Sequence, residues 1–198
     1  MGKSIEERVE ALEKKLEELS EKKQPKIRKR IRIGDTFPLV GLKWKILDIT
    51  EQGYMCHAVD PWKNAQFDSG SNDWVESKLR KEMNELADKI AEEVGEENIV
   101  QFERNLISMD GQTEYGICKD RASLLTVDEY RKYRNLIPNT EDYWWWLLTP
   151  WSAACNDDDT WVTVVSPSGY IGNFDCGDGN GVRPVCILSS IIFESEGE

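Results

Sequence analysis

The sequence contains a single histidine, His57, in 198 residues. Histidine is the side chain that most often acts as a general base near neutral pH. His57 lies in the alternating stretch GYMCHAVD and has no serine or cysteine partner at a spacing typical of nucleophilic catalysis. We therefore interpret His57 as a structural residue rather than a general base.

Cysteine is neither abundant nor paired in the sequence. The chain has five cysteines, an odd number, and no CxxC pattern. Neither a disulfide framework nor a zinc site is therefore indicated. We interpret all five as free thiols: Cys56, Cys118, Cys155, Cys176 and Cys186.

Long apolar runs are also absent. No run approaches the roughly 20 residues that a membrane-spanning helix needs. The chain begins MGKSIEERVEAL, which is charged throughout, whereas a signal peptide has an apolar central region. We expect cytoplasmic synthesis without a signal peptide, and no membrane insertion.

Positive charge is scarce. The 25 basic residues are outnumbered by 37 acidic residues, which gives a net charge of −12 and a pI near 4.7. Such a charge opposes binding to phosphate backbones, so we expect no nucleic-acid partner. Residues 1–32 hold 11 basic and 7 acidic residues, and the rest of the chain holds 14 and 30. The acidity therefore belongs to the part of the chain beyond residue 32.

Residues 1–24 have a heptad pattern. Their apolar residues are spaced 4, 3, 4 and 3 apart, and glutamate and lysine fill most of the other positions. This pattern predicts a short coiled-coil helix that joins several copies of the chain, and we favour a trimer. The alternative is that the apolar stripe packs on the globular part of the same chain. The residues of the stripe are Ile5, Val9, Leu12, Leu16 and Leu19.

Residues 25–198 contain strand patterns at both ends and helix patterns between them. A helix opened by Ser71, Asn72 or Asp73 ends at Gly95, and a second is opened by the capping box at Thr126–Glu129 and ends before Pro138. This order predicts one α+β domain with antiparallel sheets and two helices. The predicted strands are 27–33, a hairpin over 43–60 with Trp44, Ile46 and Leu47 in the core, 98–108, 144–148, a hairpin over 160–172, and 181–188.

Residues 143–190 combine aromatic and small polar residues. Five of the eight tryptophans lie there, and the run Trp144–Leu148 predicts a strand whose two faces are both buried. Glutamate, lysine, glutamine and methionine total 46 in the chain, yet none lies between Tyr143 and Phe193. A core-rich sheet disfavours glutamate and lysine, and this explains part of the gap.

Three stretches, YWWWLLTPWS, WVTVVSPSGYIG and GVRPVCIL, resemble the C-type-lectin-fold variable proteins of diversity-generating retroelements, in the subtype related to formylglycine-generating enzyme. GDTF, LKWKILDI and SLLTVDEYRKY extend the resemblance over residues 34–190. Family members often have Arg-Ser-Pro after the tryptophans, where this chain has Leu148, Thr149 and Pro150. This difference affects the expected loop, not the expected fold.

The resemblance implies a C-type-lectin-like fold with a variable region at about 143–185. In such systems template adenines are replaced during reverse transcription, so that codons of the AAC type become NNY codons, with any base at the first two positions and a pyrimidine at the third. Such codons cannot encode Trp, Glu, Lys, Gln or Met. The alternative is ordinary loop composition. If the region is diversified, its five tryptophans are fixed framework: Trp144, Trp145, Trp146, Trp151 and Trp161. Of these five, we expect Trp145 and Trp161 to be buried in the core.

The function that the resemblance implies is ligand display, with no catalytic residue, no bound metal and no cofactor. The ligand is an unknown protein or cell-surface molecule, and the coil would multiply weak contacts into avidity. The protein would act on a virion, such as a phage tail, or on a cell surface. The expected contacts are Asn156, Asp157, Asp159, Tyr170, Asn173, Phe174 and Asp175, with Trp151 flanking them and Cys155 and Cys176 as further exposed variable positions.

Three alternatives stay open at this point. An oxidase related to formylglycine-generating enzyme would use a cysteine pair, for which Cys176 and Cys186 are the candidates, but no matching active-site motif surrounds them. An assembly protein without a ligand is the second alternative. Calcium binding is the third, through oxygen ligands from Asp157, Asp158, Asp159, Asp175 and Asp178.

Overall fold

The computed structural model describes residues 31–193, together with Val9 and Lys14. The predicted coiled coil over 1–24 lies outside the described residues apart from those two positions. Residues 31–193 contain two α-helices, four short 3₁₀ helices and thirteen short strands in three sheets, and the strand pairs are almost all antiparallel. The α+β class predicted from the element order is therefore confirmed. None of the helices described in this part is long and apolar enough to cross a membrane.

The first sheet begins with the predicted hairpin. Its strand order is β1-β2-β3-β13-β5, with β8 also paired to β13. The β2–β3 hairpin turns at Glu51 and Gln52, and Trp44, Ile46 and Leu47 are buried, as predicted. The strands are β1 (Thr36–Leu39), β2 (Leu42–Thr50), β3 (Gly53–Ala58), β5 (Ile99–Val100), β8 (Ala122–Ser123) and β13 (Val185–Leu188).

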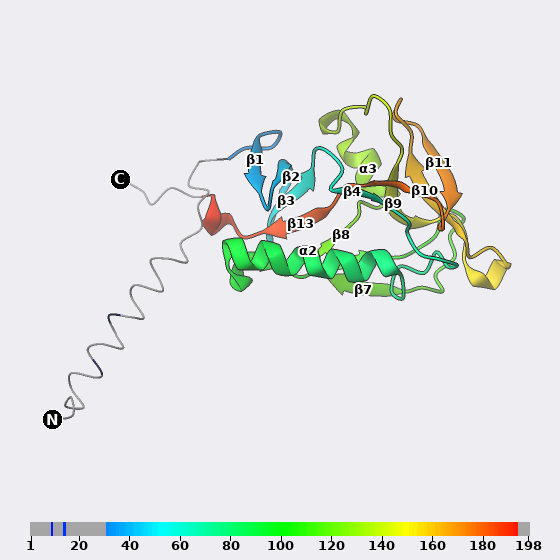
Figure 1. The fold of residues 1–198 in the computed structure, drawn as a ribbon, viewed down its shortest axis with the longest axis horizontal. Helices are drawn as coiled ribbons and strands as arrows, with labels where there is room; N and C mark the ends of the chain where they lie inside the picture. Colours follow the sequence, from blue (N-terminus) through cyan, green and yellow to red (C-terminus); the bar gives the residue numbers. More distant parts are fainter. Residues whose placement is uncertain (1–8, 10–13, 15–30, 194–198) are drawn as a thin grey trace.

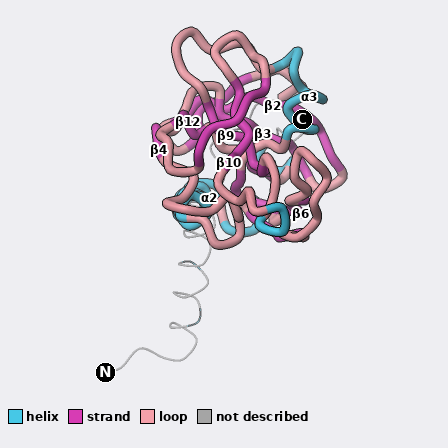
Figure 2. Tube along the Cα trace, turned by 90° about the vertical axis from the view of Figure 1, so that its right-hand side faces the viewer, coloured by secondary structure: helices cyan, strands magenta, loops and turns pink. Residues whose placement is uncertain are grey.

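The second sheet has the order β11-β10-β9-β12-β4, and β9, β10, β12 and β4 are seen side by side in Figure 2. Its one parallel pair joins β12 to β9, where Gly181 lies opposite Trp145. The third sheet is the pair β6 (Phe102–Asn105) and β7 (Ile117–Asp120). The strands of the second sheet are β4 (Lys63–Ala65), β9 (Trp145–Pro150), β10 (Trp161–Val165), β11 (Ile171–Asp175) and β12 (Asn180–Val182).

Helix α2 (Lys78–Val94) packs beside β8 and β5 of the first sheet (Figure 1). It ends at Gly95, as predicted, where a φ of 97° suits glycine. Its start is later than predicted, because Ser77, whose hydroxyl accepts a hydrogen bond from the amide of Arg80, is the N-cap. Ser71, Asn72 and Asp73 therefore lie in the preceding loop, and Asn72 has a different role there.

Helix α3 (Val127–Tyr133) continues into a 3₁₀ turn, η2 (Arg134–Leu136). The predicted capping box is present, with Thr126 and Glu129 each accepting a hydrogen bond from the other's backbone amide. Glu129 also pairs with the buried Arg104 of β6, at 2.7 Å and 2.6 Å from its two carboxylate oxygens. This bidentate pair ties α3 to the third sheet.

Three predicted strands differ from the structure. Residues 31–33 do not form a strand, because the chain turns between Arg32 and Asp35 and β1 begins only at Thr36. The stretch 98–108 is divided between β5 and β6, which belong to different sheets. The stretch 181–188 is divided at Arg183 and Pro184 into β12 and β13, so the chain crosses there from the second sheet to the first. Proline has no amide hydrogen for a sheet ladder, which fits a break at this point.

The core has two parts, one on each side of β9. Trp146 and Leu148 pack in one cluster with α2, and Trp145 and Leu147 pack in the other with α3. All four side chains are buried. The prediction that both faces of the tryptophan strand are covered is confirmed, and β9 provides a rigid base for the segment that follows it.

Candidate ligand-binding surface

The segment after β9 is held by backbone hydrogen bonds at both of its ends. The amide of Trp151 donates to the carbonyl of Trp161 at 2.9 Å, and the amide of Met109 donates to the carbonyl of Pro150 at 2.9 Å. The amide of Cys176 donates to the carbonyl of Thr160 at 2.7 Å. None of these bonds depends on a side chain of the segment. The loop 152–160 therefore leaves and re-enters the sheet at fixed points.

Asn72 supplies a second anchor for this loop. Its side-chain amide is buried and donates to the carbonyls of Ser152 and Trp161 at 3.0 Å and 2.9 Å. Its main-chain amide donates to the carbonyl of Asp159 at 2.6 Å. Tyr115 donates its hydroxyl hydrogen to Oδ1 of Asn72 at 2.7 Å. Burial and the nearby carboxylates raise the pKa of Tyr115 to about 12, so the hydroxyl stays protonated and remains a donor.

The middle of the loop faces solvent. Ala154, Cys155 and Asn156 form a 3₁₀ turn, and Asp157 closes it in the left-handed conformation with a φ of 54°. Aspartate and asparagine tolerate this conformation better than most residues. The side chains of residues 154–157 are all exposed. The structure therefore places Cys155, Asn156 and Asp157 at the surface, as expected from the sequence.

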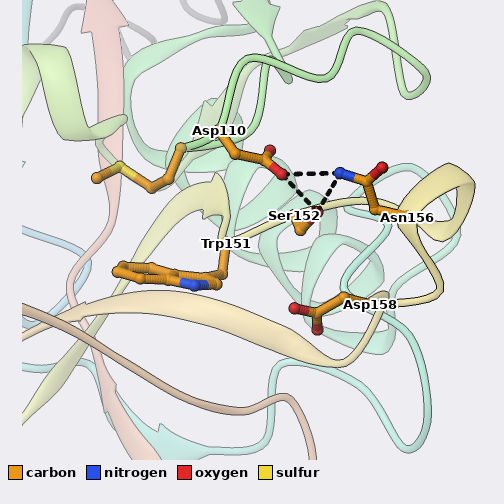
Figure 3. Close-up of a pocket in the computed structure, with 6 residues that line it drawn as sticks. Asp110, Trp151, Ser152, Asn156 and Asp158 are labelled. Atoms are coloured by element: carbon orange, nitrogen blue, oxygen red, sulfur yellow. Dashed lines mark hydrogen bonds between the residues drawn. The ribbon is translucent and has the colours of Figure 1, made fainter.

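A cleft of about 470 Å³ lies between this loop and the turn at residues 109–111. Figure 3 shows the indole of Trp151 on one side of the cleft and the carboxylates of Asp110 and Asp158 on the other. Oδ2 of Asp110 accepts hydrogen bonds from the hydroxyl of Ser152 at 2.7 Å and from the amide of Asn156 at 3.0 Å. The lining residues are Met109, Asp110, Trp151, Ser152, Asn156 and Asp158.

Asp110 is held in its ionised form. Its Oδ1 also accepts a hydrogen bond from the hydroxyl of Ser108. This bond, followed by those from Ser152 and Asn156, lowers the pKa of Asp110 below its usual value because each stabilises the carboxylate. The cleft therefore carries a fixed negative charge at neutral pH.

The predicted contacts on β11 do not form one surface with each other. Tyr170 and Phe174 both pack edge-on against Trp144, at centroid distances of 5.2 Å and 5.0 Å. Asn173 and Asp175 alternate with Phe174 along the strand, so they lie on its opposite face. Of these residues only Tyr170 is largely exposed, at 58 %, while Asn173, Phe174 and Asp175 are half-buried.

Two expectations about exposure are wrong. Cys176 is completely buried, although we expected an exposed variable position. It lies at the point where the chain leaves β11 and its amide bonds to Thr160, so its side chain points into the core. Burial raises the pKa of its thiol to about 11. Conversely, Trp161, expected in the framework, is 41 % exposed at the start of β10.

Sequence reasoning missed the residues that come from outside 143–185. Asn72 is predicted only as a possible helix cap, and Asp110, which follows the predicted strand 98–108, has no predicted role. Glu114, which accepts a hydrogen bond from the amide of Cys155 at 2.8 Å, was not singled out. Their proximity to the loop is a long-range property of the fold, and no local pattern in the sequence encodes it.

The candidate cysteine pair and the candidate calcium ligands are not brought together. Cys186 lies on β13 opposite Cys56, whereas Cys176 follows β11 in the other sheet, and all three thiols are buried. Within residues 31–193, no three side chains of the histidine, cysteine, aspartate or glutamate type are grouped closely enough to hold a metal ion.

Comparison with known proteins gives one result. Residues 63–190 match the family described as "Domain of unknown function (DUF6273)". The match runs from β4 to the 3₁₀ turn η4 (Ser190–Ile192), so it includes all of the second sheet and both helices. No curated protein and no solved structure matches the chain significantly. Since the match covers well over half of the sequence, the chain belongs to the DUF6273 family.

Proposed function

We propose that this DUF6273 protein is a ligand-binding protein diversified by a retroelement, which displays variable residues between 151 and 178 on a C-type-lectin-like scaffold. Its ligand is a protein or another cell-surface molecule. It is not an enzyme and needs no cofactor. The coil over residues 1–24 joins copies of the chain, with a trimer favoured, and the protein acts on a virion or a cell surface.

The observation that carries the proposal is how the loop 152–160 is fixed. Its backbone is held by main-chain bonds and by the buried Asn72, which lies outside the loop. Residues 154–157 are exposed, so replacing their side chains removes no core contact. A surface whose side chains change while the scaffold persists needs its backbone to be held by groups other than those side chains.

Composition supports the same interpretation. Buried sheet explains the lack of glutamate and lysine in β9, β10, β12 and β13, whose residues lie mainly in the core. It does not explain the same lack at exposed positions such as 154–157 and 178–179, since lysine and glutamate are common on protein surfaces. NNY codons, which encode neither residue, account for the lack at these exposed positions.

The chain topology supports a C-type-lectin-like scaffold. β13, near the end of the domain, returns to pair with β3 of the opening hairpin, so the two ends of the domain are joined in one sheet. The second sheet and its loops extend from the other end of the molecule (Figure 1). This arrangement places the loop 152–160 at the opposite end of the described domain from β1 (Figure 1), in a position suited to a display surface.

The alternatives have less support. The oxidase needs two cooperating thiols, whereas Cys186 is buried in β13 opposite Cys56 and Cys176 is buried just after β11 of the second sheet. An assembly protein without a ligand would explain the exposed Trp161 and Tyr170 as contacts between copies. That alternative predicts that both side chains become protected in the oligomer.

Sequencing of the DNA beside the coding region tests the proposal. We expect a near-copy of the segment that encodes residues 143–185, differing from it at adenines, close to a reverse transcriptase gene. Absence of such a copy over the surrounding genes would contradict diversification by a retroelement. The ligand-binding role of the cleft would then need independent support.

A further inference from the structure

The cleft beside Trp151 has one apolar wall and one acidic wall. The thioether of Met109 and the indole of Trp151 form the apolar wall, and both side chains are partly exposed. Asp110 and Asp158 lie across from the indole (Figure 3). A ligand that fills this cleft must therefore present an apolar surface next to a group that carries positive charge or donates hydrogen bonds.

The two carboxylates are not equivalent. Asp110 already accepts hydrogen bonds from Ser108, Ser152 and Asn156, which fix its position and its charge. Asp158 has no hydrogen bond or ion pair with any described residue, and its side chain is half-buried. A cation in the cleft would thus meet one positioned carboxylate and one that is free to pair with it.

The two segments that line the cleft also lack positive charge. Residues 106–116 and 150–180 contain no lysine and no arginine. The potential at this end of the molecule therefore attracts cations and repels anions. The acidic residues of the two segments are Asp110, Glu114, Asp157, Asp158, Asp159, Asp175 and Asp178.

An arginine side chain matches these walls better than other cations. Its planar guanidinium group stacks on indole and presents several N–H donors in one plane, so it can contact Trp151 and two carboxylates together. A lysine ammonium is more strongly hydrated and has no flat face. The volume of about 470 Å³ leaves room for the methylene stem and for adjoining backbone.

We propose that this cleft binds an arginine side chain of a protein partner, with the guanidinium group against Trp151 and between Asp110 and Asp158. This inference rests on the proposed display function and makes its ligand chemistry specific. Met109 and Asp110 lie outside residues 143–185, and NNY codons cannot encode Trp151. That part of the cleft is therefore constant, whereas Asp158 lies inside the variable region, so diversification can change the second carboxylate and the contacts around the constant wall.

The test is a titration of the ¹⁵N-labelled full chain, followed by NMR, with Nα-acetyl-arginine amide. The indole resonance of Trp151, assigned with the variant Trp151→Phe, should shift to saturation with a dissociation constant on the order of 1–10 mM, as expected for a single side chain. Nα-acetyl-citrulline amide is the neutral match and should bind at least 5-fold more weakly, roughly the effect of losing the charge. Nα-acetyl-lysine amide should also bind more weakly than the arginine compound.

Variants locate the site. Asp158→Asn should weaken arginine binding by about 3- to 10-fold, in line with the loss of one partly exposed charge contact. Asp178→Asn, an exposed residue outside the cleft lining, is the matched control and should leave binding unchanged. Unshifted resonances elsewhere will show that each variant is folded. Asp110→Asn is a second cleft variant.

Three results would overturn the inference: no saturable shift of Trp151, equal binding of the citrulline compound, or equal effects of Asp158→Asn and Asp178→Asn. Equal binding of the lysine compound would overturn the assignment to arginine. None of these results bears on diversification, because the adenine-specific copy in the neighbouring DNA tests the display function separately.

Discussion

Tyr115 donates its hydroxyl hydrogen to Oδ1 of the buried Asn72 at 2.7 Å. This bond orients the Asn72 amide so that its two hydrogens reach the carbonyls of Ser152 and Trp161. Neither Asn72 nor Tyr115 belongs to the proposed variable region. The loop that would vary is thus shaped by residues that would not.

Asn72→Ala should destabilise the protein and loosen this loop. The substitution leaves the carbonyls of Ser152 and Trp161 without the Asn72 amide, so we expect a cost of about 2–4 kcal/mol in the free energy of unfolding. Urea unfolding measures the cost, and hydrogen exchange of amides 152–161 measures the loosening. Tyr115→Phe is the control and should cost about 1 kcal/mol. Equal exchange in Asn72→Ala and the unmodified protein would show that the main-chain bonds suffice.

Trp145 and Trp161 should respond differently to truncation. Trp145 is buried between Tyr130 and the guanidinium group of Arg183, so Trp145→Ala should cost about 3–5 kcal/mol. Trp161 is 41 % exposed, so Trp161→Ala should cost about 1 kcal/mol or less. Urea unfolding of both variants measures the two losses in the free energy of unfolding. Comparable losses would mean that Trp161 is covered, for example by another copy of the chain.

Glu129 should make stability depend on pH. Burial alone would raise its pKa, but the hydrogen bonds and charge of Arg104 outweigh burial and lower the pKa below 4.5. A lowered folded-state pKa means that the ion pair stabilises the protein above about pH 4.5 and that this contribution is lost as the pH falls through the folded-state pKa.

The variant Glu129→Gln isolates this contribution. At pH 7 it should be less stable than the unmodified protein by about 2–4 kcal/mol, because it leaves the buried Arg104 without its partner charge. The difference should shrink as the pH is lowered below 4.5, as measured by urea unfolding at several pH values. A difference that stays constant down to pH 3 would contradict the assigned pKa direction.

Thiol reactivity should separate Cys155 from Cys176. Cys155 is exposed and should react quickly with an aromatic disulfide reagent, whereas Cys176 is buried and should react only on unfolding. The rapid phase should disappear in Cys155→Ser and persist in Cys176→Ser. Rapid modification of Cys176 would show that its thiol is exposed and that the residue belongs to the display surface.

Local patterns predicted the elements whose stability is local. The β2–β3 hairpin, the Thr126–Glu129 capping box and the two-sided burial of β9 follow from turn residues, spacing and bulk, and the structure agrees. The start of α2 was predicted too early because three successive polar residues, Ser71, Asn72 and Asp73, could each cap a helix, and the use of Ser77 depends on where Trp74 and Leu79 pack.

The rest depended on long-range arrangement. Arg183 and Pro184 separate two strands of different sheets, although the mostly apolar stretch 181–188 predicts a single strand. The cleft joins residues 109–110 to residues 151–158, and no periodicity links these segments. The burial of Cys176 and the exposure of Trp161 likewise follow from the pairing of β10 with β11, which residue type alone does not determine.

The central claim is that the exposed residues of the display loop can change while the fold persists. A library with NNY codons at Ala154, Cys155, Asn156 and Asp157 tests it, matched by a library with the same codons at the buried Leu147, Leu148, Val162 and Val164. We predict that most members of the first library remain soluble and lose less than about 1 kcal/mol of stability, whereas most members of the second fail to fold. Similar proportions of misfolded members in the two libraries would contradict the account.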